Sequence, residues 1–432
     1  MTTAVVLFTR DLRLHDNPAL HAAVNGADEI VPLFVVDEVI AGGRFTNPNR
    51  AAFLADCLRD LDESLRKRDT RLVVRHGDPV VETCSVVQAV GAASVHVAED
   101  YSRYGMRRER RLRDALGSVE LITHASHAAV PPGSVTTTGG ASFSVFTPYY
   151  RRWAQERLRD PLPAPRRLKL PKIAAGRPPS AAEICDGLRS RALPTGGEQV
   201  ARRLAQRWYS RGVAGYDDGH DALADDATSR LSPYLHFGCI SATELVARAD
   251  RRAGGVEAFL RQLAWRDFFQ QVLAEHPDVV DRDLRTHHDR WRKPIREIEA
   301  WREGKTGYPL VDAGMRQLRD EGWMHNRARL VVGSFLTKHL YVDWRVGAQH
   351  FTDWLVDADV ANNTLNWQWV AGTGTDSRPN RMLNPVLQQQ RYDPDLAYVR
   401  RHVPEFGTPS YPEPIVEHAE AVARFKAARS SK

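Results

Sequence analysis

The chain has 432 residues, of which 42% are hydrophobic and 26% are charged. This length allows two or three domains, and the composition excludes a small disulfide scaffold, a disordered chain and a membrane protein. Sixty lysine and arginine residues against fifty-four aspartate and glutamate residues give a formal net charge of +6, which favours a polyanionic partner without identifying one.

The sequence also limits the compartment and the chemistry. No run of 18 apolar residues occurs, and charge follows the first apolar run too closely for a secretory leader, so we expect a cytoplasmic protein without membrane contact. The four cysteines lack the spacing of a zinc site or of a disulfide framework. We expect no metal site, and we expect buried thiols at Cys57, Cys84, Cys185 and Cys239.

Five short apolar runs alternate with amphipathic segments between residues 3 and 123. The runs are rich in β-branched residues, which suits strands covered on both faces, and the segments between them suit crossover helices. In chain order the runs are AVVLF, EIVPLFVVD, RLVVRHGD, SVHVAED and VELITH. Residues 1–128 are therefore predicted to form a Rossmann-like α/β domain with a parallel five-stranded sheet, although TRDLR stands where a dinucleotide-binding GxGxxG would follow the first strand.

The composition changes after the α/β pattern ends. Residues 129–198 are rich in proline, glycine, serine and threonine, which is typical of an inter-domain linker, and one short helix is expected within it at 149–159. From residue 199 onward, leucine, alanine, arginine and tryptophan recur at helical spacing. Residues 199–432 are therefore predicted to form an all-α domain.

Tryptophan is concentrated in the predicted helical domain, which holds every tryptophan of the chain except Trp153. This aromatic content is consistent with a flat or photochemical group among the helices. The plainer interpretation is that tryptophan fills helical cores, and it is the more frequent one. The residues alone leave both interpretations open.

Residues 228–233, TSRLSP, place three hydroxyl groups and a guanidinium at a predicted helix start. Backbone N–H groups at such a start can receive a phosphate or pyrophosphate, but the same pattern is also an ordinary helix cap with an early proline. Residues 303–306, EGKT, imitate a P-loop, yet Glu299 occupies the position of the required first glycine and no predicted strand precedes it. The sequence therefore excludes a P-loop nucleoside triphosphatase.

Two further strings combine polar and aromatic side chains. Residues 357–369 hold two aspartates, the amide of Asn363 and two indoles, and they lack the glycine and the further oxygen ligands of an EF-hand. They favour hydrogen bonds to a polar ring or an acid pair at a helix start. Residues 323–329, WMHNRAR, interleave basic groups with an indole, which suits phosphates and a displaced base. Their alternative is a solvated helix face with one buried tryptophan.

Taken in order, these strings match one family over nearly the whole chain. The matching segments are TRDLRLHDNPAL, TSRLSPYLHFGCIS, LAWRDFF, EGKTGYPLVDAGMRQLRDEGWMHNRAR, DWRVG, DADVANNTLNWQW and LNPVLQ. On these segments the chain resembles the DNA photolyase/cryptochrome family, most closely its class I cyclobutane pyrimidine dimer (deoxyribodipyrimidine) photolyases. The resemblance implies an α/β antenna domain, an all-α FAD-binding domain, UV-damaged DNA as partner, and a monomeric lyase that repairs dimers by electron transfer from excited, reduced FAD.

The resemblance also assigns roles by position. Asn363 would face the flavin N5 edge, and Arg329 would pair with Asp357. The implied FAD contacts are Tyr216, Thr228, Ser229, Arg230, Leu231, Ser232, Phe259, Arg329, Asp357, Ala358, Asp359 and Asn363. The implied catalytic set is Asn363 together with the chain of tryptophans through which light reduces oxidised flavin, namely Trp367, Trp344 and Trp291.

For damaged DNA the resemblance implies a pocket that receives the flipped-out dimer, with Trp265 and Trp369 on its flanks. The implied substrate contacts are Gln262, Trp265, Arg266, Trp323, Asn326, Arg327, Leu330 and Trp369. Arg266, Arg327 and Arg381 would hold the kinked backbone at the mouth of the pocket, so affinity would fall with salt. No side chain needs to act as a nucleophile or as a general acid.

Three positions depart from the usual pattern of dimer-repairing members. Gln262 stands where a glutamate is usual, Leu330 where a methionine is usual, and Phe259 where a tryptophan is common. Glutamine is familiar in animal cryptochromes and (6-4) photolyases, so a cryptochrome-type blue-light photoreceptor and a (6-4) photolyase are the alternatives. Against the (6-4) class, His325 is followed by Asn326 instead of completing a histidine pair.

A second chromophore is expected in the α/β domain. Residues 100–105, DYSRYG, look more like deazaflavin-binding relatives than methenyltetrahydrofolate-binding ones. We therefore expect Asp100 to contact a deazaflavin-type antenna. The arginines between residues 103 and 113 are interpreted as a solvated helix face rather than as a DNA contact.

Overall fold

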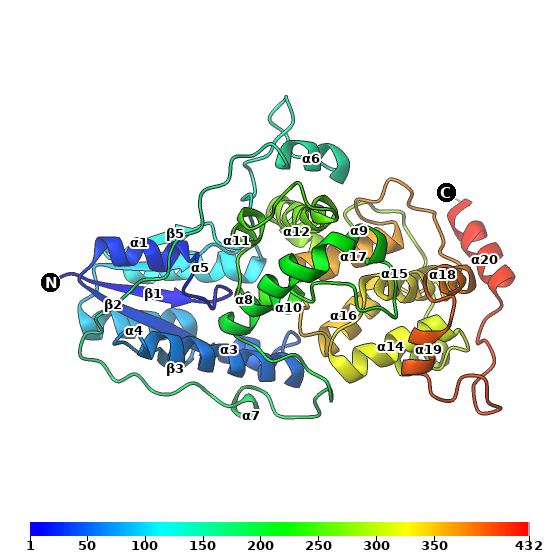
Figure 1. The fold of residues 1–432 in the computed structure, drawn as a ribbon, viewed down its shortest axis with the longest axis horizontal. Coiled ribbons are helices and arrows are strands. Elements are labelled where there is room, and N and C mark those ends of the chain that lie inside the picture. Colours follow the sequence, from blue (N-terminus) through cyan, green and yellow to red (C-terminus); the bar gives the residue numbers. More distant parts are fainter. Residues whose placement is uncertain (431–432) are drawn as a thin grey trace.

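The computed structural model describes residues 1–430, and it places an α/β part and a helical part end to end along the long axis of the molecule (Figure 1). The α/β part is built on five parallel strands in the order β3-β2-β1-β4-β5. The strands are β1 (Thr3–Phe8), β2 (Glu29–Asp37), β3 (Val73–Gly77), β4 (Ser94–Ala98) and β5 (Glu120–His124). The predicted parallel five-stranded sheet is confirmed.

Helices connect these strands on both faces of the sheet. They are α1 (Pro18–Gly26), α2 (Glu38–Ala41), α3 (Pro48–Arg66), α4 (Pro79–Val90) and α5 (Arg103–Leu116). Asn17, Asn47 and Asp78 cap α1, α3 and α4 through their side chains, and a proline follows each cap. An oxygen-bearing cap satisfies a free N–H group and proline fits the first helical position, so these short signals fix where each helix begins.

The sheet is buried on both faces, as the unbroken apolar runs predict. Every residue of β1 is buried, and Val6 and Phe8 join the core that includes Leu20 of α1 and Phe53 of α3. Val5 and its neighbours in β1 that point the other way pack instead with residues of α4 and α5. Alternation along each strand therefore divides its side chains between two cores.

The strand order reverses between β1 and β4. In open parallel sheets, ligands bind beyond the carboxyl ends of the strands at such a switch point, because the two following loops diverge there. The segments that leave these strand ends are 9–11 and 99–100. This edge faces the helical part of the molecule, to which Arg10 is joined by an ion pair.

The linker follows the surface of the sheet instead of hanging free. Its helices are α6 (Phe146–Trp153) and α7 (Ala181–Ile184). The single helix predicted at 149–159 is therefore wrong in its bounds, because the four aromatic residues that α6 buries lie at 146–153 and the basic, proline-bounded stretch after them buries no apolar stripe. Backbone bonds from Val74 to Ala175 (2.7 Å) and from Ile30 to Lys169 (2.8 Å) tie the linker to strands β3 and β2.

The helical part covers residues 198–430. Its described residues form no β-strand and contain one isolated β-bridge, between Arg292 and Val342. Its α-helices are α8 (Glu198–Arg207), α9 (Tyr216–Gly219), α10 (Ser232–His236), α11 (Ala242–Ala247), α12 (Val256–Glu275), α13 (Ile295–Glu303), α14 (Pro309–Glu321), α15 (Asn326–Ser334), α16 (Trp344–Trp354), α17 (Val360–Ala371), α18 (Pro385–Tyr392), α19 (Ala397–His402) and α20 (His418–Ser430). Shorter turns are η1 (Trp208–Gly212), η2 (Val213–Gly215), η3 (Pro277–Val280) and η4 (Phe335–His339), of which η1 and η4 are π-helical.

Arg10, directly after β1, forms an ion pair with Asp359, the N-cap of α17. The Asp359 side chain is 6% exposed and also receives Gln270 Nε2 of α12 at 3.3 Å. Burial alone would raise the pKa of the Asp359 carboxyl, but the guanidinium groups of Arg10 and Arg266 outweigh it and hold that pKa well below its usual range. The charged carboxylate therefore joins the sheet to the helical part.

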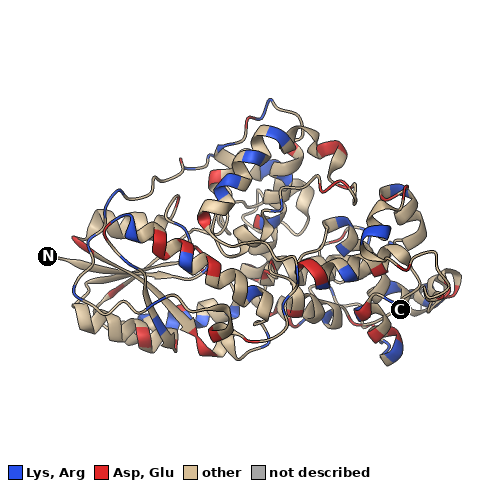
Figure 2. Cartoon of the chain, turned by 60° about the horizontal axis from the view of Figure 1, so that its bottom comes forward, with Lys and Arg blue, Asp and Glu red and all other residues tan. Residues whose placement is uncertain are grey.

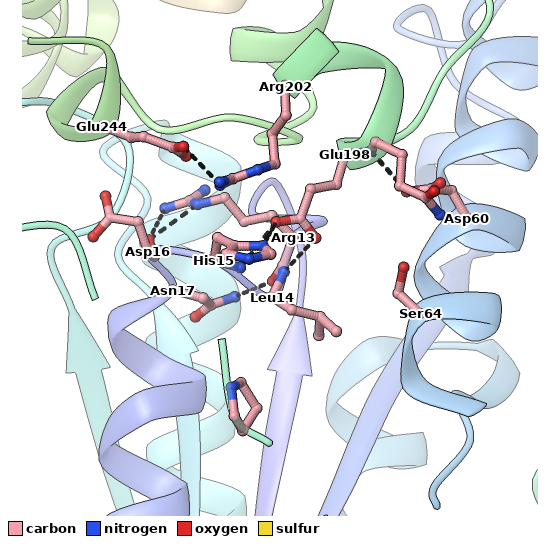
Figure 3. Close-up of polar contacts among 12 residues, drawn as sticks. Arg13, Leu14, His15, Asp16, Asn17, Asp60, Ser64, Glu198, Arg202 and Glu244 are labelled. Atoms are coloured by element: carbon pink, nitrogen blue, oxygen red, sulfur yellow. Dashed lines mark hydrogen bonds and ion pairs between the residues drawn. The ribbon is translucent and has the colours of Figure 1, made fainter. Parts of the chain in front are cut away.

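A second set of interdomain bonds surrounds the loop after β1 (Figure 3). Glu198 at the start of α8 accepts the backbone N–H groups of Leu14 at 2.8 Å and His15 at 2.9 Å. Arg13 is buried and donates to the carbonyl of Gly238, which precedes α11, at 3.0 Å. The loop thus finds its hydrogen-bond partners in the other half of the chain.

Replacement of Arg10 by glutamine should lower the free energy of unfolding by about 3 kcal/mol, because it leaves a buried carboxylate without its counter-ion. Guanidinium denaturation followed by circular dichroism measures this change. Arg252→Gln is the matched control, since Arg252 and its partner Asp250 are 90% and 58% exposed and such pairs contribute little. An unchanged midpoint in Arg10→Gln would show that the ion pair does not hold the two halves together.

Candidate functional site

Segments distant in the sequence meet around the start of α17. Asp359 receives Arg10 and Gln270, and His236 Nδ1 of α10 lies 4.0 Å from its carboxylate. Arg329 of α15 donates through Nη2 to Asp357 at 2.9 Å, so the expected Arg329–Asp357 ion pair is present. Ala358 between the two carboxylates is buried. The contacts link α10, α12, α15 and α17 around one site.

Asn363 lies one helical turn after Asp359 on α17, and its side-chain amide is hydrogen-bonded to α16. Its Nδ2 donates to the carbonyl of Ala348 at 3.0 Å and to Thr352 Oγ1 at 3.2 Å. Because Nδ2 is committed, Oδ1 is the atom that the half-buried side chain offers to a ligand, and among residues 1–430 no group donates to it. An acceptor fixed in this way suits an N–H group at the edge of a polar ring.

The segment 228–232 presents hydroxyl groups beside this site. Thr228 Oγ1 is buried and has no hydrogen-bond partner among the described residues, whereas Ser232 is exposed at the start of α10. Arg230, with φ of 50°, pairs with both Asp226 and Glu321. The guanidinium that we expected at a phosphate is thus shared between two carboxylates, and the hydroxyl of Thr228 is the unengaged group.

Aromatic side chains from η1, α9 and α12 pack together. Tyr216 of α9 and Phe259 of α12 are buried, and their ring centroids lie 6.0 Å apart in an edge-to-face arrangement. Trp208 packs on both rings, at 5.3 Å from Tyr216 and 5.5 Å from Phe259. Sequence reasoning missed Trp208, which carries no motif of its own and is identified only by this contact.

The residues expected to face a lesion lie on α12 and on the segment around α15. Gln262 is exposed on α12, and Trp265 is half-buried one turn later. One face of the Trp265 indole is covered by Phe146 of α6, with ring centroids 3.6 Å apart and planes 9° from parallel. The linker helix therefore packs against Trp265, a contact that the sequence did not indicate.

Arg266 requires a correction. We expected it at the mouth of the pocket, but it is buried, and its guanidinium donates to the carbonyls of His127 and Leu235. It also lies 3.7 Å from Asp267. These partners lie in both halves of the chain, so Arg266 belongs to the interface between them. Position next to Trp265 in the sequence did not show on which side of α12 the side chain points.

The residues 323–330 have different environments: one caps a helix, and others are exposed or partly exposed. His325 is the N-cap of α15 through Nδ1, and burial lowers its pKa to about 4, so the ring is neutral at physiological pH. Asn326 is exposed and Leu330 is half-buried. Arg327 pairs with Asp221 through two nitrogens, and its guanidinium lies 4.3 Å from the centre of the Tyr392 ring.

Two indoles border this string. Trp323 donates through Nε1 to Ser232 Oγ at 3.2 Å, which connects it to the hydroxyl-bearing segment, and Arg230 lies 4.1 Å above its ring. Trp369, near the end of α17, is half-buried, and the Arg381 guanidinium lies 4.9 Å from its ring centre. Arg381 is exposed. Both indoles are therefore contacted by an arginine.

The three tryptophans expected to relay electrons differ in burial. Trp367 is 3% exposed and packs against Phe351, while Trp344 is 1% exposed and donates to Asp283 at 2.8 Å. Trp291 is half-buried, with its ring 5.0 Å from that of Tyr341. Two of the rings are thus sealed in the core, and the third reaches solvent.

A buried polar cluster occupies the switch point of the sheet. Burial would raise the pKa of Asp100, but Arg10 and Arg108 lower it below its usual value. Among the described residues, Arg108 Nε and His127 Nε2 are buried without hydrogen-bond partners. A Cβ on Gly105 would lie 2.3 Å from the Asp100 side chain, so this glycine lets α5 approach the cluster closely. Unengaged donors beside a charged carboxylate can hold a polar ligand.

Three of the sequence expectations concern metals, membranes and thiols. In residues 1–430, no three His, Cys, Asp or Glu side chains gather as metal ligands would, and no helix there is long and apolar enough to cross a bilayer. Cys57 and Cys239 are buried with their sulfurs 3.3 Å apart, but Cys84 and Cys185 are partly exposed. The expectation of four buried thiols is therefore wrong for two of them.

Comparison with known proteins places the chain in a family. The model of DNA photolyase matches residues 4–166, and that of the FAD binding domain of DNA photolyase matches residues 259–410. A deoxyribodipyrimidine photo-lyase of Streptomyces griseus is 54% identical over 99% of both chains. An archaeal photolyase of Sulfolobus tokodaii with two FAD molecules superposes with a TM-score of 0.88 at 30% identity over 100% of both chains. A Synechocystis cryptochrome superposes at 0.91 and 27% identity, over 100% of this chain and 99% of its own.

A parallel α/β domain joined to an FAD-binding helical domain defines a two-domain flavoprotein. The chain belongs to the DNA photolyase/cryptochrome family.

Glu109 of α5, whose carboxyl group accepts the N–H of Asp100 at 3.0 Å, provides a test of the buried cluster around Asp100. Burial raises its pKa to about 7, above that of a carboxyl in the unfolded chain. Between about pH 4.5 and 7 the folded protein therefore keeps a proton that the unfolded chain has lost, and stability falls as the pH rises through this window. Glu109→Gln removes this titration and should flatten the fall, which denaturation midpoints at about pH 5 and pH 7.5 measure. Glu120→Gln, exposed on β5, is the control. An equally steep fall in Glu109→Gln would assign the effect to another group.

Proposed function

We propose that this protein is a light-dependent deoxyribodipyrimidine photo-lyase that repairs cyclobutane pyrimidine dimers in UV-damaged DNA. One observation carries the proposal: α17 presents the anchored amide of Asn363, the buried indole of Trp367 and the half-buried indole of Trp369 within two turns. A ring contact, an electron relay and a wall for an extruded base then lie on one rigid helix. The 54% identity to a protein of this name over the full chain supports the same function.

FAD fits the residues that surround the start of α17. The unpartnered Thr228 hydroxyl, with Ser229, Leu231 and Ser232 at the start of α10, would receive the pyrophosphate. Asn363 would accept from the N5 edge of the ring through Oδ1. Bound in its reduced form, FAD supplies the light-driven electron that splits the cyclobutane ring. The remaining proposed contacts are Tyr216, Arg230, Phe259, Arg329, Asp357, Ala358 and Asp359.

The charged side chains Arg329, Asp357 and Asp359 are held by the protein before any ligand binds. The ion pair between Arg329 and Asp357 fixes both groups at the site, and Asp359 is fixed by Arg10. Because these groups are positioned before binding, less entropy is lost when FAD binds, and the flavin ring would be kept at a constant distance from the substrate pocket. The contribution of Arg230 is indirect, since its charge is engaged by Asp226 and Glu321.

The substrate pocket receives nucleotides that have left the duplex, because a stacked dimer cannot reach a buried ring. Trp265 and Trp369 form its aromatic walls, and Leu330 and Trp323 extend them. Gln262 offers both a donor and an acceptor to the pyrimidine edge. Asn326 is exposed beside the pocket, on the same helix as Arg327.

Phosphate contacts rest on local arginines. Basic and acidic residues are interspersed over both parts of the chain, so neither part is uniformly basic or uniformly acidic (Figure 2). Arg381 is exposed and Arg327 is half-buried, and both are available to a bent backbone. Arg327 shares its guanidinium with Asp221, so a phosphate must compete with that carboxylate.

Gln262 is the observation that favours the alternatives, a (6-4) photolyase or a cryptochrome-type photoreceptor, and the cryptochrome superposition shows that the fold does not separate these classes. The neutral His325 argues against the (6-4) reaction. Its Nδ1 caps α15, its pKa is about 4, and its neighbour is Asn326. Dimer repair is therefore the function that we retain.

We further propose that the cluster around Asp100 holds a second, antenna chromophore of the deazaflavin type rather than methenyltetrahydrofolate. The unengaged nitrogens of Arg108 and His127 support this assignment, and Gly105 lets α5 lie close against Asp100. The Sulfolobus protein carries two FAD molecules, which supports a second chromophore of flavin size in the present chain. We propose a cytoplasmic, monomeric protein.

The function is tested by illuminating the FAD-loaded, reduced protein with blue light in the presence of oligonucleotides that carry a single defined lesion. We expect loss of the cyclobutane dimer and return of intact thymines by chromatography, with the (6-4) photoproduct unchanged. The same mixture kept dark is the control. Unchanged dimer content in the light would reject the proposal, and repair of the (6-4) product instead would select the alternative.

Trp291→Phe tests the electron relay of Trp367, Trp344 and Trp291. The replacement removes the solvent-exposed end of the chain, so photoreduction of oxidised FAD should become at least several-fold slower, as absorbance of the flavin under blue light measures. Repair by chemically reduced protein should be unaffected, because it does not use the relay. Trp354→Phe, a half-buried indole outside the relay, is the control. Photoreduction at the normal rate in Trp291→Phe would show that electrons take another route.

A further inference from the structure

Lys338 is a buried ammonium that none of the functions described above uses. It lies in the π-helical turn η4 and is 1% exposed. Among residues 1–430 it forms no ion pair, and its Nζ donates instead to two backbone carbonyls, those of Pro379 at 2.9 Å and of Arg381. A buried charge without a counter-ion is costly, and a methionine would fill the same space at lower cost.

We propose that Lys338 is the positioning residue for Arg381, holding segment 373–382 so that the Arg381 guanidinium lies on the Trp369 ring and faces the DNA backbone. The inference rests on the proposed function in that it takes Trp369 as a wall of the lesion pocket. It assigns the strength of DNA binding partly to a side chain that touches neither DNA nor flavin.

The carbonyls that Lys338 binds flank Asn380 and include that of Arg381 itself. Fixing them sets the direction in which the Arg381 side chain leaves the backbone. The guanidinium then lies 4.9 Å from the Trp369 ring centre, while the residue is exposed to solvent. An arginine stacked on an indole keeps its outer N–H groups free for a phosphate.

The rest of the segment depends on few other contacts. Arg285 donates to the carbonyls of Thr373 at 2.7 Å and Asp376 at 3.2 Å, and Leu383 N–H bonds Ser334 Oγ at 3.1 Å. These bonds hold the two ends. Lys338 is therefore the anchor of the stretch next to Arg381.

The geometry brings the segment close to α17. Gly372 has φ of 81°, and a Cβ there would lie 2.2 Å from the carbonyl oxygen of Pro379. The Pro379 carbonyl therefore turns back toward the end of α17 and toward Lys338 beneath it. This close return explains how a single ammonium reaches two carbonyls of one short loop.

Helix α20 seals the anchor from water. The Phe425 ring centre lies 5.5 Å from Lys338 Nζ, and Arg429 donates to the carbonyl of Ala371 at 3.1 Å. Burial lowers the pKa of Lys338 to about 7, with Asp376 acting to raise it and Arg429 and Arg381 to lower it. Near pH 7 the Lys338 side chain is therefore only partly protonated, and its Nζ has N–H groups for the two carbonyls in either form, which agrees with a role in holding the segment.

The test compares Lys338→Met, Arg381→Gln and the double variant, all loaded with FAD, for affinity toward a dimer-containing oligonucleotide. We expect about a fivefold loss in Lys338→Met, the size of one cation–π contact. In Lys338→Met, the FAD content, the photoreduction rate and the repair rate at saturating DNA should equal those of the unchanged protein. The double variant should bind no more weakly than Arg381→Gln, because Lys338 acts through Arg381. Lys305→Met, an exposed lysine, is the control.

Additive losses in the double variant would overturn the proposal, as would full affinity in Lys338→Met. Should Lys338→Met fail to fold, Lys338→Gln keeps one donor and should show a smaller loss with the same non-additivity. Hydrogen exchange of the amides at 380–382 without DNA gives an independent reading. It should accelerate in Lys338→Met and not in Arg381→Gln. If the wild-type protein does not bind or repair the dimer-containing oligonucleotide, the proposed function is rejected. If hydrogen exchange at 380–382 is unchanged in Lys338→Met, the role of Lys338 as an anchor is rejected.

Discussion

The molecule depends on one buried charge, the carboxylate of Asp359. It caps α17 by accepting the N–H of Asn362 at 2.9 Å, it pairs with Arg10 from the end of β1, and it receives Gln270 from α12. A helix start is a favourable place for a carboxylate, because free N–H groups and the helix dipole stabilise negative charge there. The same group therefore sets the start of the site helix and the position of the α/β part relative to it.

Because α17 begins at this carboxylate, the interface and the proposed chemistry share one element. Asn363 and Trp367 follow Asp359 by one and two turns, so their side chains lie on the same side of the helix. Arg10 also lies near Asp100. The carboxylates of Asp359 and Asp100 both raise the pKa of the Arg10 guanidinium. The buried cluster in the sheet and the site among the helices are thus connected through a single guanidinium.

Local sequence patterns predicted the features that depend on neighbouring residues, such as the strands of the sheet. Strand β1 is buried on both faces, so its apolar run is unbroken and the parallel sheet could be read from it. The ion pair of Arg329 with Asp357 followed from family position. The direction of Arg266, the stacking of Phe146 on Trp265 and the anchor at Lys338 did not follow, since each depends on a contact with a segment far away in the chain. Periodicity reports which face of a helix is apolar, but not which distant carbonyl a buried cation meets.

The path of the linker limits how the molecule can be divided. Carbonyls of Lys169 and Ala175 accept the N–H groups of Ile30 and Val74, and Asp267 of α12 accepts the N–H groups of Ala129 and Val130. A fragment that stops at residue 128 would leave amides of β2 and β3 without these acceptors, with exposed sheet edge that invites pairing between copies. The α/β part is thus not a detachable module, and exchanging it between relatives requires transferring the linker together with it.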